Sequence, residues 1–137
     1  MGLKVEFKSM EYVWAELPQI RLEWCYIIYP TSFGVDEPTS EEDYDIAKVV
    51  AIYPINDRRA IISWETETDK DQYEEEGDIK AIVLDHIKNM IEEIEEYGER
   101  ENDWLRICYN DQVLSYIDVH ELKEVIERDL KDVKVEI

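Results

Sequence analysis

Basic residues are scarce in this chain of 137 residues, where 15 Lys and Arg stand against 35 Asp and Glu and give a formal net charge of −20. A protein that binds nucleic acid through its phosphates needs a basic surface, and an anionic membrane repels an acidic chain for the same reason. We therefore expect neither nucleic acid nor a membrane as a direct partner. The apolar content of 45% is too high for an acidic disordered tail, so we expect a single folded domain over residues 1–137.

Long apolar runs are also missing. The longest, Cys25 to Pro30, has the length of a strand and falls well short of the roughly 20 residues that cross a bilayer. The N-terminus carries Lys4 and Glu6 inside its first apolar stretch, so it lacks the hydrophobic region of a secretory signal. These features predict a cytoplasmic protein.

Glycine, cysteine and histidine, which build many functional sites, are few. The four glycines stand apart from one another, so no phosphate-binding loop is indicated. Cys25 and Cys108 show no Cys-x-x-Cys spacing, and we expect two buried free thiols, with a bridge possible only if their strands are adjacent. His86 and His120 each stand beside an acid, and we interpret both as surface side chains. The sequence predicts no catalytic residues, no metal and no cofactor, and we do not expect an enzyme.

Apolar periodicity predicts an α+β domain, with two or three helices packed on one face of a mainly antiparallel sheet. Helices are expected over residues 10–17, 78–97 and 118–130, although residues 10–17 could instead extend the first strand. Strands are expected over residues 3–7, 20–29, 46–55, 60–67, 105–109, 113–117 and 133–137. Residues 31–44 and 68–77 lack apolar alternation and are expected to be exposed acidic loops. In the longest helix, Asp78 is the expected N-cap and Gly98 the expected end, and the expected buried stripe is Val83, Ile87, Met90, Ile94 and Tyr97.

The acids are clustered in three blocks. The first block is Asp36, Glu37, Glu41, Glu42, Asp43 and Asp45. The second is Glu65, Glu67, Asp69, Asp71, Glu74, Glu75, Glu76 and Asp78, and the third is Glu92, Glu93, Glu95, Glu96, Glu99, Glu101 and Asp103. The segment from Asp118 onward instead mixes seven acids with four basic residues, as an ordinary solvated surface does.

A charged ridge is predicted along the longest helix, because 100° per residue places Asp85, Glu92, Glu96 and Glu99 opposite its buried stripe. At ~1.5 Å of rise per residue, neighbouring members of this helix ridge stand ~5 to 10 Å apart. Like charges at this spacing destabilise a helix, and solubility alone requires a net charge of only about 2 to 8. The clustering therefore favours a function in binding, the alternative being an acidic background without functional meaning.

These patterns predict a small inhibitor that presents carboxylates where phosphates would bind, in the nucleic-acid site of a basic protein or nuclease. The expected partner-binding residues are Asp36, Glu37, Glu41, Glu42, Asp43, Asp69, Asp71, Glu74, Glu75, Glu76, Asp85, Glu92, Glu96 and Glu99, with Tyr44, Tyr73 and Trp104 as aromatic anchors. In size, acidity and expected layout the chain resembles phage anti-restriction and anti-CRISPR proteins, a class united by charge, so the resemblance implies no particular site residues. The alternatives are an immunity protein or antitoxin against a toxin nuclease, and a non-enzymatic accessory domain whose acidity is incidental.

Overall fold

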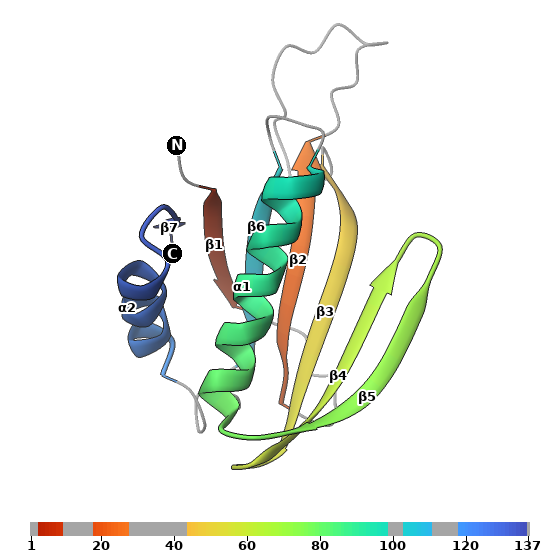
Figure 1. The fold of residues 1–137 in the computed structure, drawn as a ribbon, viewed down its shortest axis with the longest axis vertical. Helices are drawn as coiled ribbons and strands as arrows, with labels where there is room; N and C mark the ends of the chain where they lie inside the picture. Colours follow the sequence, from red (N-terminus) through yellow and green to blue (C-terminus); the bar gives the residue numbers. More distant parts are fainter. Residues whose placement is uncertain (1–2, 10–17, 28–43, 99–102, 111–117, 137) are drawn as a thin grey trace, which may run out of the picture.

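The computed structural model describes residues 3–9, 18–27, 44–98, 103–110 and 118–136 (Figure 1). Within these ranges the chain forms one mixed sheet of seven strands and two helices, which confirms the predicted α+β class. In chain order the elements are β1 (Lys4–Ser9), β2 (Ile20–Ile27), β3 (Tyr44–Asn56), β4 (Arg59–Thr66), β5 (Lys70–Glu76), α1 (Ile79–Tyr97), β6 (Trp104–Tyr109), α2 (Val119–Asp129) and β7 (Lys134–Glu136).

The strand order is β5-β4-β3-β2-β6-β1-β7. The four pairings from β5 to β6 are antiparallel, whereas β1 runs parallel to both β6 and β7. The sheet is therefore mostly antiparallel, and β5 and β7 are at its two edges within the described ranges. Three predicted elements lie outside the described residues: the helix over 10–17, the loop over 31–43 and the second strand of a hairpin over 113–117. The first strand of that hairpin is β6, which pairs along its two edges with β1 and β2.

Strand β2 shows how the two faces of the sheet differ. Successive side chains point to opposite faces of a strand. Ile20 and Leu22 are buried in the apolar core, whereas Glu23 and Cys25 belong to the opposite, polar face. Helix α1 crosses the apolar face and contacts β2, β3 and β6 (Figure 1).

Helix α1 begins and ends where its caps predict. The side chain of Asp78 accepts a hydrogen bond from the Ala81 N–H at 3.1 Å, and the Gly98 N–H donates to the Ile94 carbonyl at 2.8 Å. The predicted buried stripe is confirmed up to Ile94, but Tyr97 is 64% exposed, because packing of the helix against the sheet ends one turn earlier.

Helix α2 lies beside β1 and β7 (Figure 1). Its N-cap is Asp118, as predicted, which accepts from the His120 N–H at 2.8 Å. Val119, Leu122 and Ile126 of α2 belong to the same buried cluster as the apolar side chains of α1. An ion pair between Lys80 and Glu121 also joins the two helices.

The prediction of a loop over residues 68–77 is wrong, because β5 forms there and pairs with β4. Lys70 stands opposite Glu65 at one end of this pairing, and Glu76 stands opposite Arg59 at the other. An edge strand that is almost entirely exposed buries no alternating apolar residues, so its order comes from main-chain pairing that local sequence does not reveal. The side chains of Asp69 and Asp71 accept from the main-chain N–H of the residue that follows each, at 2.9 and 2.8 Å. These aspartates occupy backbone donors on an edge strand that could otherwise pair with another chain.

Gly77 sets the turn from β5 into α1, with a φ of +146° and an N–H that donates to the Arg58 carbonyl at 2.8 Å. Side chains other than glycine rarely adopt this backbone conformation. We expect Gly77→Ala to lower the free energy of unfolding by about 1–3 kcal/mol in a denaturant titration. Thr68→Ala in the exposed β4–β5 turn is the control, with an expected change within about 0.5 kcal/mol. Equal stability of the two variants would show that position 77 does not require the backbone conformation that glycine adopts there.

Candidate functional site

The second acidic block lies on β4, on β5 and in the turns that follow these strands, and Glu92, Glu93, Glu95 and Glu96 of the third block lie toward the end of α1. In Figure 1, α1 runs across β2, whereas β4 and β5 lie beyond β3. A contact between His86 Nε2 of α1 and Glu75 Oε2 of β5, at 2.8 Å, joins the helix to the strand that carries most of the second block. Residues 65–97, here called the acidic segment, hold thirteen acids against three lysines, so their ten excess negative charges are half of the net charge of −20.

Few acids of the acidic segment are neutralised. Glu74 pairs with Arg59 and Glu93 with Lys48 at 2.9 Å, and Glu75 Oε2 lies 2.8 Å from His86 Nε2. Among the described residues, no ion pair neutralises the other ten acids, which are Glu65, Glu67, Asp69, Asp71, Glu76, Asp78, Asp85, Glu92, Glu95 and Glu96. The structure therefore leaves a concentrated negative field over β5 and α1.

The predicted site residues divide between described and undescribed parts of the chain. Asp85, Glu92 and Glu96 are exposed on α1, and Asp69, Asp71, Glu74 and Glu76 are exposed on β5 and the turn before it. Glu75 is half-buried against His86. Asp36, Glu37, Glu41, Glu42, Asp43 and Glu99 lie outside the described residues.

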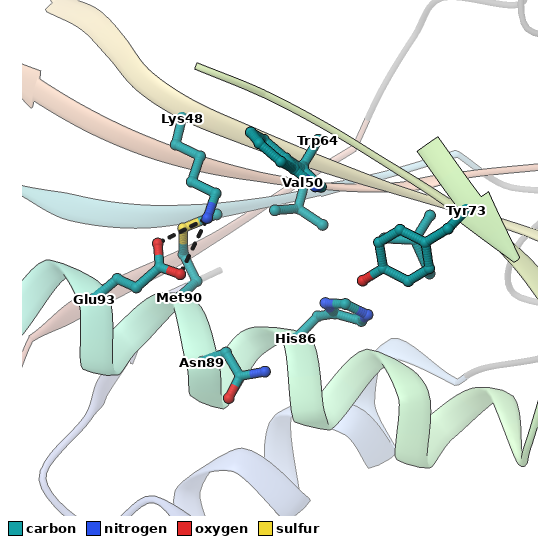
Figure 2. A pocket seen from close by; sticks show the side chains of 9 residues that line it. Lys48, Val50, Trp64, Tyr73, His86, Asn89, Met90 and Glu93 are labelled. Atoms are coloured by element: carbon teal, nitrogen blue, oxygen red, sulfur yellow. Dashed lines mark hydrogen bonds and ion pairs between the residues drawn. The ribbon is translucent and has the colours of Figure 1, made fainter. Parts of the chain in front are cut away.

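A groove lies between α1 and strands β3, β4 and β5, with a cavity of about 180 Å³ (Figure 2). The Lys48–Glu93 ion pair stands toward one end, and the contact between His86 and Glu75 stands toward the other. Lys48 Nζ lies 5.5 Å from the centroid of the Trp64 ring, and the Tyr73 ring stands opposite His86 (Figure 2). The residues that line the groove are Lys48, Val50, Ile62, Trp64, Tyr73, His86, Asn89, Met90 and Glu93. Sequence analysis missed this groove because its walls come from four elements that meet only in the folded chain.

The predictions for His86 and for two aromatic anchors need correction. The His86 side chain is only 13% exposed, and its partner is Glu75 of β5 rather than the neighbouring Asp85, because the helix turns it toward the sheet. Tyr73 is 42% exposed, as an anchor should be. Tyr44 and Trp104 are half-buried, with ring centroids 5.9 Å apart in an edge-to-face arrangement on the polar face of the sheet.

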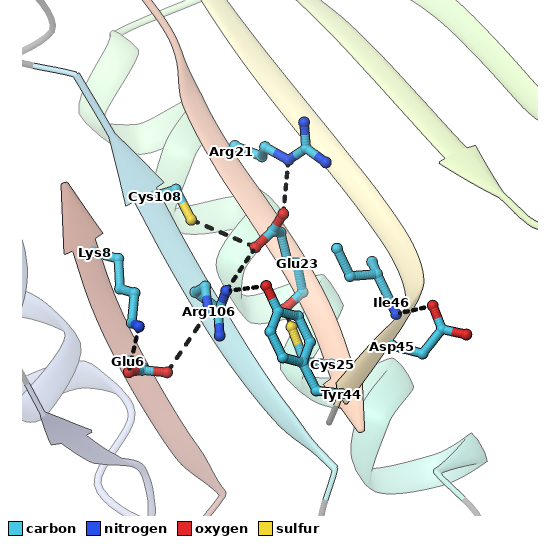
Figure 3. Close-up of polar contacts among 10 residues, drawn as sticks. All are labelled: Glu6, Lys8, Arg21, Glu23, Cys25, Tyr44, Asp45, Ile46, Arg106 and Cys108. Carbon is cyan, nitrogen blue, oxygen red and sulfur yellow. Dashed lines mark hydrogen bonds and ion pairs between the residues drawn. The ribbon is translucent and has the colours of Figure 1, made fainter. Parts of the chain in front are cut away.

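A buried charged cluster on this polar face was not predicted (Figure 3). Glu23 and Arg106, directly paired between β2 and β6, are each 6% exposed, with Nη1 and Oε1 3.7 Å apart. Arg106 also donates to the Tyr44 hydroxyl at 2.7 Å, and Arg21 Nε lies 2.8 Å from Glu23 Oε2. Alternation places these residues on a polar face, which is normally solvated, so their burial was not evident from the sequence.

The two cysteines are free and buried, as predicted. They share the polar face of adjacent strands, but Cys108 stands opposite Arg21 and Cys25 opposite Trp104, an offset of ~13 Å that a disulfide cannot span. Burial, with a further contribution from Glu23, raises the pKa of the Cys25 thiol to about 12 and also raises the pKa of Cys108. Both thiols are therefore protonated at neutral pH and are poor nucleophiles.

No family model matches the chain, and neither a curated protein nor a solved structure matches it. In the part of the chain that the structure describes, no three His, Cys, Asp or Glu side chains are grouped so that they could hold a metal ion. None of the described helices has the length and apolar character of a membrane span. A functional proposal therefore depends on the charge and shape of the surface.

The charge of the acidic segment predicts an unusual response to salt. Raising ionic strength from about 0.01 M to about 0.15 M shortens the Debye length from about 30 Å to about 8 Å and screens repulsion between unpaired carboxylates. We expect the thermal midpoint to rise by about 2–4 °C for each kcal/mol of repulsion removed. Sodium and potassium chloride should act equally in a calorimetric scan, because screening depends on ionic strength. An unchanged or lower midpoint would mean that the acids are already compensated.

Proposed function

We propose that this protein is a non-enzymatic acidic inhibitor that binds a basic nucleic-acid-binding protein or nuclease and occupies its nucleic-acid site. The observation that carries the proposal is the acidic segment, where ten acids have no ion-pair partner among the described residues. In this respect the protein would act as a DNA mimic of the anti-restriction or anti-CRISPR type. Its place of action would be the cytoplasm.

The geometry of α1 supports mimicry of a phosphate backbone. Asp85, Glu92 and Glu96 are exposed on one side of a rigid helix and recur at ~5 to 10 Å along its axis. This linear density of negative charge is of the same order as that of one strand of duplex DNA. A rigid row of carboxylates can therefore meet a row of lysines and arginines without first being ordered.

The energetic cost of the acidic segment also supports a binding role. Glu92 and Glu96 are a like-charged i, i+4 pair, which destabilises a helix by ~0.2–0.5 kcal/mol. Folding and solubility gain nothing from this arrangement, since a net charge of about 2 to 8 keeps a small domain soluble. Binding to a cationic surface removes the repulsion and gives fast, steered association.

The arrangement of the helices fits the same proposal. We infer that α1 and α2 cover the same face of the sheet, because buried side chains of both belong to one core cluster. The exposed sides of the two helices then differ in charge pattern, acidic on α1 and mixed on α2. A partner with a cationic surface would bind the exposed side of α1 in preference to that of α2.

Capture followed by displacement tests the proposal. The tagged protein is incubated with host lysate at low salt, and bound protein is then challenged with short duplex DNA or with inorganic phosphate at the same ionic strength. We expect duplex DNA, but not phosphate, to release the captured partner. A partner that stays bound in the presence of duplex would contradict mimicry and would indicate an immunity protein that binds outside the nucleic-acid site.

A further inference from the structure

The groove beside α1 already contains a cation. Lys48 extends from β3 so that its Nζ lies 2.9 Å from Glu93 Oε2 and 3.1 Å from Oε1, beside the face of Trp64 (Figure 2). A carboxylate and an indole face are the two groups that recognise a cationic side chain. The side chains of Lys48 and Glu93 are 21% and 37% exposed, so an incoming group can reach them.

The size of the cavity favours a side chain over a free small molecule. Ligand pockets commonly have volumes of about 300–1,000 Å³. The groove has about 180 Å³, bounded by Trp64 and Tyr73 on the sheet and by His86 on α1. One extended side chain from a protein partner suits this volume.

We propose that the groove receives an arginine side chain of the basic partner and that Lys48 is an internal cation which this arginine displaces from Glu93. The identity of the partner rests on the proposed function above. A guanidinium group can bind the Glu93 carboxylate with two parallel hydrogen bonds while its plane stacks on Trp64, whereas an ammonium group acts as a point charge. The surrounding acidic segment raises the local concentration of cations and so complements an arginine-bearing surface.

Two lysine variants with the same change in charge test the role of Lys48. The probe is a blocked tri-arginine peptide, with blocked tri-citrulline as its neutral control, and binding is followed through the NMR signal of the Trp64 indole N–H. Lys48→Met removes the internal competitor, whereas Lys88→Met removes one charge from an exposed position on α1 that does not line the groove. We expect Lys48→Met to bind tri-arginine about three- to tenfold more tightly than Lys88→Met.

Two glutamate variants test the carboxylate independently of Lys48. Glu93→Gln should weaken tri-arginine binding more than Glu92→Gln, which makes the same change of charge at the neighbouring exposed position. Equal affinities within either pair of variants, or binding that leaves the Trp64 signal unmoved, would overturn the proposal. This titration uses no nucleic-acid-binding protein, so its outcome is independent of the displacement experiment. If the titration fails while duplex DNA still displaces the captured partner, only the arginine groove is contradicted. If the titration succeeds but no such partner is found, only the proposed inhibitor function is contradicted.

Discussion

Reversing three carboxylates of the helix ridge, with Asp85→Lys, Glu92→Lys and Glu96→Lys together, is expected to weaken binding of the basic partner by about a hundredfold or more. Each substitution replaces attraction by repulsion on a surface that steers association, so the association rate should account for most of the loss. Surface plasmon resonance at two salt concentrations measures both the rate and its salt dependence, which should become shallower in the variant.

The matched control reverses three exposed carboxylates after Asp118. Glu124, Glu127 and Asp132 are exposed and have no ion pair among the described residues, so Glu124→Lys, Glu127→Lys and Asp132→Lys change the net charge by the same amount. The higher salt concentration screens the effect that any change in total charge has on association. Under that condition the dissociation constant of this control should stay within about threefold of the wild-type value. Equal losses in both triple variants would show that only the total charge matters.

Arg106→Met is expected to lower the free energy of unfolding by about 3 kcal/mol, the lower end of the range for a broken buried ion pair. The substitution leaves Glu23 buried beside the protonated Cys108 thiol, whose Sγ donates to Glu23 Oε1 at 3.5 Å. Arg21 still contacts the other Glu23 oxygen at 2.8 Å, which limits the loss. Chemical denaturation monitored by circular dichroism measures the effect.

A double-mutant cycle separates the pair from its surroundings. Glu23→Met combined with Arg106→Met removes both buried charges and should recover most of the loss, since an apolar pair of similar volume needs no compensation. Arg128→Met is the control, because Arg128 is 71% exposed and solvent screens its pair with Asp129, so this substitution should leave the free energy of unfolding almost unchanged. A double variant as unstable as Arg106→Met alone would contradict the account of an uncompensated charge.

The sequence correctly predicted the ends of α1 and its exposed side, which depend on residues close together in the chain. The carboxylate of Asp78 begins α1, and Gly98, where a side chain would collide with the Ile94 carbonyl, ends it. Helical spacing places Glu92 and Glu96 on the exposed side of the helix. These features depend on residues within one or two turns of one another, so sequence alone is sufficient.

Features that depend on pairing distant segments were missed. Strand β5 is ordered by hydrogen bonds to β4 and contributes no apolar pattern of its own. The contact between His86 and Glu75, and the buried pair of Glu23 and Arg106, arise from the way α1 and β6 join the sheet. A carboxylate in the sequence gives no indication of whether a cation from another element will reach it.

Equilibrium competition between duplex DNA and this protein for the purified partner is the sharpest test of DNA mimicry. The apparent dissociation constant of the complex is measured at increasing concentrations of duplex that the partner binds. Mimicry predicts that the constant rises linearly with free duplex and without limit, because the two ligands use the same site. A rise that levels off, with a ternary complex of partner, duplex and inhibitor, would contradict it.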